Sequence, residues 1–202
     1  MKYYILASLI LFGLIIRHNS RKGRKQNEQN EKSFWQREEE ANNVRRKPLD
    51  DLEYITLPLE EFPVSILSED EKVKNCVETI QKLATQKIVN LTGYTNTDLK
   101  LMYGTANITP LTEYDQNYTL LVRTLQEWAN LLYEASYLEE AQTLLEFAVS
   151  THTDISKTYY LLAEIYSKNL DFSKIESLTE AVKELKSLNK NTILRTLQES
   201  YQ

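Results

Sequence analysis

Apolar residues recur every three or four positions along most of the chain after residue 68, which is the spacing of one face of an α-helix. The first such run predicts a helix over 69–92, capped by Ser68 with Glu71 three residues on and stopped by Gly93. Its apolar stripe consists of Val73, Cys76, Val77, Ile80, Leu83, Ala84 and Ile88. Because Cys76 lies on this stripe, it is predicted to be a core residue and not a reactive thiol.

The remaining pattern predicts an all-α fold. Residues 94–112 favour a loop that contains a short helix, TDLKLMYG. A long helix is expected to begin at a cap on Thr112 and to end near Ser136. Further helices are expected over 138–151, 156–169, 172–187 and 191–201. The helical domain is therefore expected to span 68–202.

A repeat is present within this domain. The stretch LQEWANLLYEASYLEEAQTLLEFAV aligns with YYLLAEIYSKNLDFSKIESLTEAV at one constant offset, which we call the repeat length. The matched pairs are Leu125 with Tyr159, Trp128 with Leu162, Ala129 with Ala163, Leu132 with Tyr166, Ala141 with Ile175 and Ala148 with Val182. Alanines at such places let paired helices approach closely, while large residues fill the space between them.

A helix-turn-helix unit with a repeat length of about 34 residues resembles the tetratricopeptide repeat family. The family's first-helix places are taken by Leu125, Trp128, Ala129 and Leu132, and its second-helix places by Ala141, Leu145 and Ala148. The second repeat departs from the family at Ile175 and Thr179, and the closing proline is absent. The resemblance covers 122–188 and implies a solenoid of antiparallel helix pairs. Helices 69–92 and 191–201 would then cover its two ends, whereas the alternative is a generic helical bundle.

The resemblance also implies a groove along the first helices that holds extended peptides or partner helices. The positions of this groove are Arg123, Gln126, Asn130, Tyr133, Lys157, Tyr160 and Glu164. Some family members clamp a peptide carboxylate, and Asn130 matches one clamp place. Gln126 and Glu164 depart from the clamp pattern, so no clamp is predicted. Simple solvent exposure would explain the same polar residues.

The N-terminus predicts a membrane anchor. Residues 3–16 are uncharged and mostly apolar, and as a helix they would extend about 21 Å, less than the roughly 30 Å hydrocarbon core. Lys2 and Arg17 can reach past the ends of the span. The alternative is a signal peptide, but the residues after the run make a poor cleavage site. Because the basic residues following it stay on the cytoplasmic side, residues 1–17 are expected to anchor a cytoplasmic domain, N-terminus outside.

Residues 18–67 are predicted to connect the anchor to the helical domain. A flexible linker over 18–32 is expected to lead into a short helix capped by Ser33 and stopped by Pro48. Phe34 and Trp35 on this helix could rest on the membrane interface or dock on the folded domain. Residues 52–63 are expected to be extended. A simple tether is the favoured interpretation, and docking in the groove as an autoinhibitory segment is the alternative.

Composition and charge narrow the function. The 202 residues include only four Gly and four Pro, which disfavours β-rich folds. Residues 1–25 contain six basic and no acidic residues, whereas the remainder has 18 basic and 29 acidic, a poor match for nucleic acid. Two isolated histidines and no nucleophile–base set indicate neither a metal site, nor a cofactor, nor an enzyme.

The sequence therefore predicts a membrane-anchored adaptor or scaffold that binds a protein or peptide partner. Its basic flank could also attract anionic lipid headgroups. The alternatives are an exported, membrane-tethered chaperone or envelope factor and a structural subunit of a membrane complex. The layout resembles those of mitochondrial outer-membrane import receptors and of envelope-regulating scaffolds from bacteria, and the composition is more similar to that of Gram-positive bacterial proteins.

Overall fold

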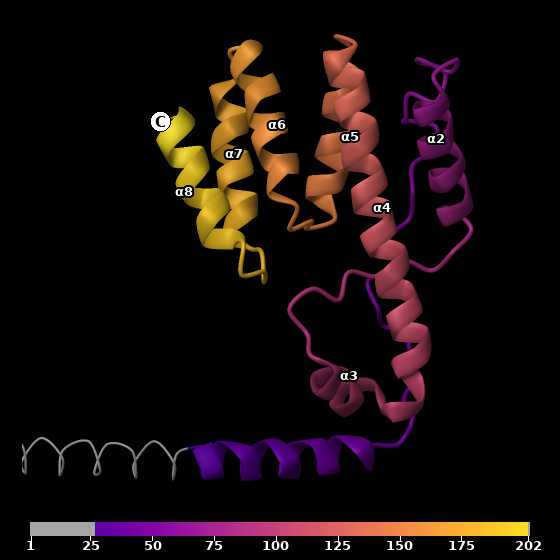
Figure 1. The fold of residues 1–202 in the computed structure, drawn as a ribbon, viewed down its shortest axis with the longest axis vertical. Helices are drawn as coiled ribbons and strands as arrows, with labels where there is room; N and C mark the ends of the chain where they lie inside the picture. The colour runs from indigo at the N-terminus through magenta and orange to yellow at the C-terminus, as the bar shows by residue number, and fades with distance from the viewer. Residues whose placement is uncertain (1–26, 202) are drawn as a thin grey trace, which may run out of the picture. The chain divides into compact units, whose positions relative to one another are not determined.

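The computed structural model describes residues 27–201, and this part of the chain is all-α. A helix over 27–42 is followed by the elements labelled in Figure 1. These are α2 (Glu71–Leu83), α3 (Asn96–Tyr103), the 3-10 helix η1 (Thr105–Asn107), α4 (Ile108–Glu134), α5 (Leu138–Ser150), α6 (Ser156–Lys168), α7 (Phe172–Lys183) and α8 (Lys190–Tyr201). Over residues 27–201 the β structure is limited to an isolated bridge between Tyr54 and Val89. The all-α prediction is confirmed.

The predicted membrane anchor, residues 1–17, lies outside the described residues. Across 27–201, no helix combines the length and the apolar character needed to cross a bilayer.

The chain divides into two compact units, and the division differs from the expected boundary at residue 68. The first unit comprises the described part of Met1–Lys47 together with Thr95–Ile108. The second comprises Pro48–Tyr94 and Thr109–Gln202. Residues 48–67, expected as a connection, thus belong with the helical array, and α3 belongs with the helix over 27–42.

Polar contacts hold the first unit together. The helix over 27–42 is paired with α3 through Arg37–Asp98 at 2.6 Å and through Glu38–Lys100. Asn107 is fully buried, and its amide nitrogen donates to the carbonyl oxygens of Lys47 and Tyr103 at 2.7 Å each. Because a buried amide without partners would be costly, these bonds specify how the segment before Pro48 meets η1.

The helix of the first unit begins earlier than predicted. Residues 27–32 are helical and not a flexible linker, so Ser33 lies inside the helix and not at its cap. The Ser33 hydroxyl donates to the Asn30 carbonyl at 2.8 Å, a bond typical of helix interiors. The run of Gln, Glu and Asn is polar enough to resemble a linker, yet Gln and Glu favour helix. The helix ends at residue 42, before Pro48.

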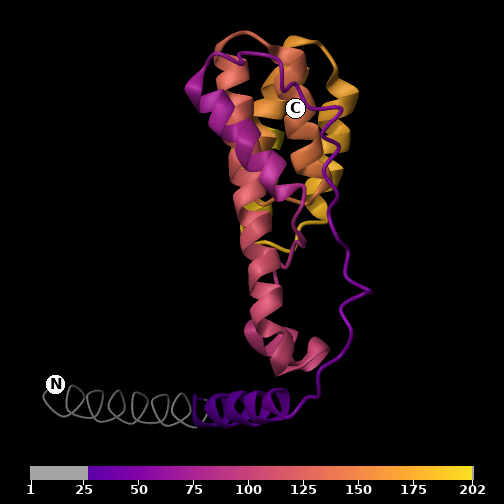
Figure 2. The same cartoon turned by 90° about the vertical axis from the view of Figure 1, so that its right-hand side faces the viewer.

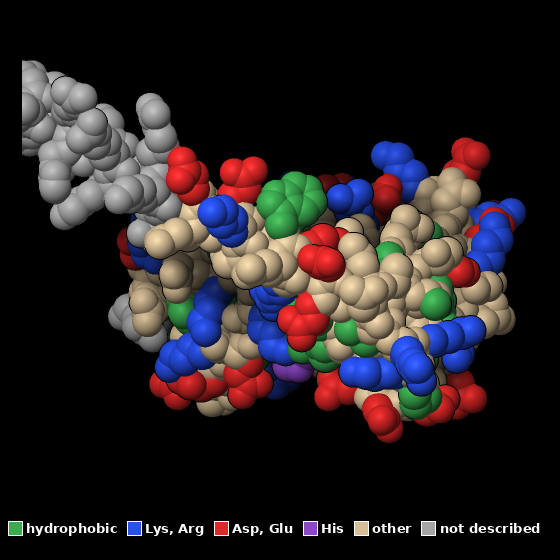
Figure 3. Space-filling model, turned by 90° about the horizontal axis from the view of Figure 1, so that it is seen from below, with side chains coloured by type: hydrophobic (Ala, Val, Ile, Leu, Met, Phe, Trp, Pro, Cys, Tyr) green, Lys and Arg blue, Asp and Glu red, His purple; other side chains and the backbone are tan. Residues whose placement is uncertain are grey.

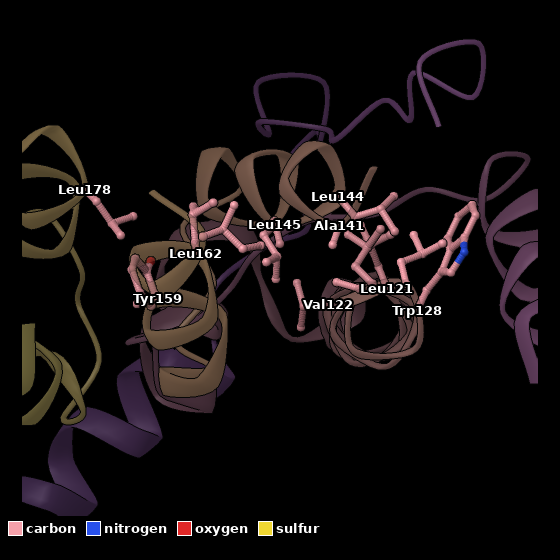
Figure 4. Close-up of a cluster of buried hydrophobic side chains, with 14 of the residues drawn as sticks. Leu121, Val122, Trp128, Ala141, Leu144, Leu145, Tyr159, Leu162 and Leu178 are labelled. Carbon is pink, nitrogen blue, oxygen red and sulfur yellow. The ribbon is translucent and has the colours of Figure 1, made fainter. Parts of the chain in front are cut away.

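In the second unit, α5, α6, α7 and α8 stand side by side and antiparallel, next to the C-terminal half of α4 (Figure 1). Their core contains both members of every residue pair that the repeat matches. Ala129, Ala141, Ala148 and Ala163 are completely buried, which lets the helices approach as expected. Figure 4 shows side chains of this core, with Leu145 of α5 lying between those of α4 and α6.

The backbone itself repeats with the same period as the sequence. Helices α4 and α6 end at Glu134 and Lys168, and α5 and α7 begin at Leu138 and Phe172. The turns contain left-handed residues at equivalent places, Ser136 with φ 66° and Leu170 with φ 59°. Both turns are closed by the same hydrogen bond, from Tyr137 N to Leu132 O and from Asp171 N to Tyr166 O, each 2.9 Å. The sequence repeat is thus also a repeat of helix-turn-helix geometry.

The same register continues into α8. Its first residue, Lys190, lies one repeat length after Ser156, the first residue of α6. Ile193 and Leu197 are buried where α8 contacts α6 and α7. At the other side of the array, α2 contributes Val73, Cys76, Ile80 and Leu83 to the core. Both elements therefore bury apolar residues in the core that includes the repeat.

Helix boundaries were predicted wrongly at both ends of α2 and at the start of α4. Asp70 and not Ser68 caps α2, because its carboxylate accepts from the backbone of Lys72 at 2.8 Å and of Val73 at 3.2 Å. The helix ends at Leu83 and not at residue 92, and Ile88 and Val89 are buried in extended backbone next to Tyr54 and Ile55. Ala84 is exposed. Similarly, Thr112 lies inside α4, which begins at Ile108.

The segment before α2 is not a tether, and it is not extended throughout as predicted. Residues 59–61 form turns, in which Glu61 N donates to Pro58 O at 3.0 Å. Phe62 is 4% exposed and meets Trp128 and Phe147 edge-on, with ring centroids 6.2 and 5.2 Å away. Leu57 is buried in the same core. Figure 2 shows the segment following the helical array before it enters α2. Tyr54 of the same segment meets Tyr114 of α4 edge-on, with ring centroids 5.9 Å apart. None of these aromatic partners is a predicted groove residue, so the autoinhibitory arrangement is not the one found.

Candidate functional site

The predicted groove residues lie on α4 and α6, the first helices of the two repeats. Hydrogen bonds join several of them to a neighbouring helix. Arg123, Gln126, Asn130 and Tyr133 belong to α4, and Lys157, Tyr160 and Glu164 belong to α6. We call the surface formed by these seven residues the first-helix face. Some of them form hydrogen bonds between helices, whereas Arg123 and Lys157 form no ion pair with the described residues.

Gln126 joins α4 to α6 and is nearly buried. Its amide oxygen accepts from the Thr158 hydroxyl at 2.6 Å, and its amide nitrogen donates to Asn130 at 2.8 Å. Since both ends of the amide are occupied within the protein, Gln126 acts as an internal connection. The sequence reasoning missed Thr158, a buried threonine whose hydroxyl gives no periodic signal.

Tyr133 and Glu164 form a second connection between the same helices, together with Lys168. The Tyr133 hydroxyl donates to the Glu164 carboxylate, and Lys168 pairs with Glu164 at 3.1 Å and lies 4.5 Å from the centre of the Tyr133 ring. The Tyr133 hydroxyl, followed by Lys168, lowers the pKa of the Glu164 carboxyl. The cluster remains roughly half exposed, so it is accessible to a ligand. Lys168 was not predicted, although its position four residues after Glu164 signals an ion pair.

Tyr160 extends the connections to the last helix, because its hydroxyl donates to the Thr196 hydroxyl of α8 at 3.3 Å. Arg123 and Lys157 differ from the others. Both are exposed, they occupy equivalent places in consecutive repeats, and neither forms an ion pair with a residue of the described range. Leu120, one turn before Arg123, is 47% exposed. This end of the face thus offers two free cations and an apolar side chain.

The titratable groups of the second unit offer little reactive chemistry. Cys76 is buried, and desolvation followed by the nearby Glu127 and Asp70 carboxylates raises the pKa of its thiol to about 11. Such a thiol stays protonated at neutral pH and is a poor nucleophile. Within residues 27–201, no three His, Cys, Asp or Glu side chains are grouped so that they could hold a metal ion.

Acidic and basic side chains are interspersed over the surface seen in Figure 3. A phosphate backbone is bound by a face on which positive charge gathers. The charges seen in this view are instead of both signs.

The chain matches no protein-family model, and no curated protein and no solved structure matches it. The assignment of a function therefore depends on the geometry of the chain itself.

Proposed function

We propose that this chain is a membrane-anchored adaptor whose tetratricopeptide-like helices bind a segment of a partner protein at the cytoplasmic side of the membrane. The observation that carries the proposal is the pair of free cations, Arg123 and Lys157, at equivalent positions on consecutive first helices. Stacked repeats present the same position at regular intervals, which suits a ligand that runs across the helices.

The partner segment would be acidic where it meets these cations. Exposed charges of complementary sign guide association and select the partner more than they add affinity. Leu120 beside Arg123 supplies an apolar contact, and the Tyr133–Glu164 cluster supplies hydrogen-bonding groups farther along the face. Because Gln126 and Tyr160 are committed to neighbouring helices, they would keep the face rigid and would contribute little direct binding.

The membrane part of the proposal depends on residues 3–16 and the basic residues after them. An apolar run with five cationic residues at its C-terminal side favours an uncleaved anchor and a cytoplasmic domain. A topology reporter at the C-terminus tests this directly. Activity of the reporter only outside the membrane would favour the exported chaperone or envelope factor.

Crosslinking in cells followed by capture of the full-length protein tests the binding face. We would compare Arg123→Glu/Lys157→Glu with Lys74→Glu/Lys82→Glu, which makes the same charge change on exposed positions of α2. One dominant partner that is lost only from the first variant is the expected result. If both variants retain the same partner, the first-helix face is not the binding site, and a structural subunit held by other surfaces becomes the better interpretation.

A further inference from the structure

An apolar cleft of about 280 Å³ lies between the second helices of the two repeats, α5 and α7, with α6 beneath it. Its lining residues come from α5, α6 and α7, and they include Val149, Leu162, Tyr166, Leu178 and Ala181. None of the first-helix face residues lines it. The volume is at the small end for a ligand pocket and suits one large side chain rather than a whole cofactor.

The repeat explains why the cleft exists. Leu162 and Ala181 lie one repeat length after Trp128 and Phe147. In the first repeat, the rings of Trp128 and Phe147 fill their surroundings together with Phe62. In the second, an isobutyl group and a methyl group stand in their places, so the same backbone leaves space unfilled. Helix α5 supplies the other wall.

The first repeat, which holds Phe62, indicates what the cleft in the second repeat would bind. The two residues that contact Phe62 correspond to two residues that line the cleft. Phe62 arrives on a non-helical segment, LPLEEFPV, whose backbone forms turns, with Glu61 N donating to Pro58 O at 3.0 Å. A non-helical segment carrying a large apolar residue is therefore a ligand that this architecture already accommodates once within the chain.

We propose that the cleft between α5 and α7 is a second docking site, which receives an aromatic or large aliphatic side chain from a non-helical segment of another protein. Leu162, only 1% exposed, forms part of its floor. Glu146 and Lys174 stand at the rim and pair with each other at 3.3 Å. Glu146 also accepts from the Tyr166 hydroxyl at 2.8 Å, so the rim joins α5, α6 and α7 and presents charged groups to the polar backbone of an arriving segment. This site does not depend on the first-helix face.

Binding of a fluorescein-labelled peptide to the full-length protein, followed by fluorescence anisotropy, tests the proposal. The probe is ITLPLEEFPVSI, the chain's own residues 55–66, and the control peptide carries Phe62→Ala. We expect saturable binding of the first peptide and at least about ten-fold weaker binding of the second, since burying a Phe side chain is worth more than one factor of ten. Equal binding of the two peptides would overturn the proposal.

One variant closes the cleft. Ser177→Tyr blocks the entrance from an exposed position that does not endanger folding. It should weaken peptide binding about ten-fold or more, while Glu176→Tyr on the same helix should change it less than about two-fold. Binding that survives Ser177→Tyr would show that the peptide docks elsewhere.

A competing explanation for peptide binding is that the cleft receives residues 55–66 of a second copy of this chain. Sedimentation velocity of the unlabelled protein distinguishes the two. A monomer at all concentrations is expected. A concentration-dependent dimer that disappears in the Ser177→Tyr variant would assign the cleft to a second copy and overturn the proposal of a separate partner.

Discussion

The first and second repeats have the same backbone geometry and differ in the side chains that fill the space between their helices. Around the first pair, α4 and α5, Trp128 and Phe147 enclose Phe62 from a segment distant in sequence. Around the second pair, α6 and α7, Leu162 and Ala181 leave a cleft. The comparison teaches that the register of the repeat sets where helices lie, whereas the size of a few side chains decides whether a repeat is closed by the chain or left open.

Truncating Trp128 and its equivalent Leu162 to alanine should show most strongly that the two repeats differ in packing. Trp128→Ala should lower the free energy of unfolding by about 3–5 kcal/mol, because it empties a fully buried site beside Phe62. Leu162→Ala should cost nearer to about 2 kcal/mol, since it deepens a cleft that is already open. Urea unfolding followed by far-UV circular dichroism measures both. Equal losses would mean that the repeats are equally well packed.

Phe62 tests whether the first repeat depends on its added segment. Phe62→Ala should destabilise the protein by about 3 kcal/mol, because its ring packs on two aromatic rings in the core. Val64→Ala on the same segment should stay within about 0.5 kcal/mol, since Val64 is exposed. If both changes are neutral in urea unfolding, the segment is a tether after all.

Enlarging a small residue should have opposite effects on the free energy of unfolding in the cleft and in the packed core. Ala181→Phe should raise the free energy of unfolding by about 0.5–2 kcal/mol, because it fills existing space. Ala148→Phe should lower it by about 1–3 kcal/mol or more, because Ala148 is completely buried between helices. Thermal unfolding gives the direction of each change, and a destabilised Ala181→Phe variant would argue against usable space in the cleft.

The smallest expected effect concerns the connection between the repeats. Tyr133→Phe removes the hydroxyl that does most to lower the pKa of Glu164, so this pKa should rise toward its ordinary value. A carboxyl with a lowered pKa in the folded state stabilises it above the unfolded pKa, and this stabilisation is lost as the pH falls through the folded pKa. Carbon-detected NMR titration of Glu164 follows the shift. An unchanged pKa would mean that Lys168 alone holds the carboxylate.

Much of the helical array could be predicted because it depends on local spacing. Apolar residues three and four apart identify a helix wherever it packs, and alanines that recur at the repeat length identify which helices pair. The starts of α5, α6 and α7 agree with the pattern for this reason. The candidate face was located in the same way, by position in the repeat. The sequence could not separate Gln126, bound to Thr158, from the free Arg123, because that difference depends on a side chain of another helix.

The sequence by itself determined the all-α class, the existence of the main helices and the register of their repeat, since these follow from residues close along the chain. The tertiary structure decided where α2 ends, because Ile88 and Val89 leave the helical pattern to meet Tyr54 and Ile55. It also decided that Phe62 closes the first repeat and that nothing in the described chain closes the second. Those outcomes depend on contacts between distant segments, whose free energy no local pattern contains.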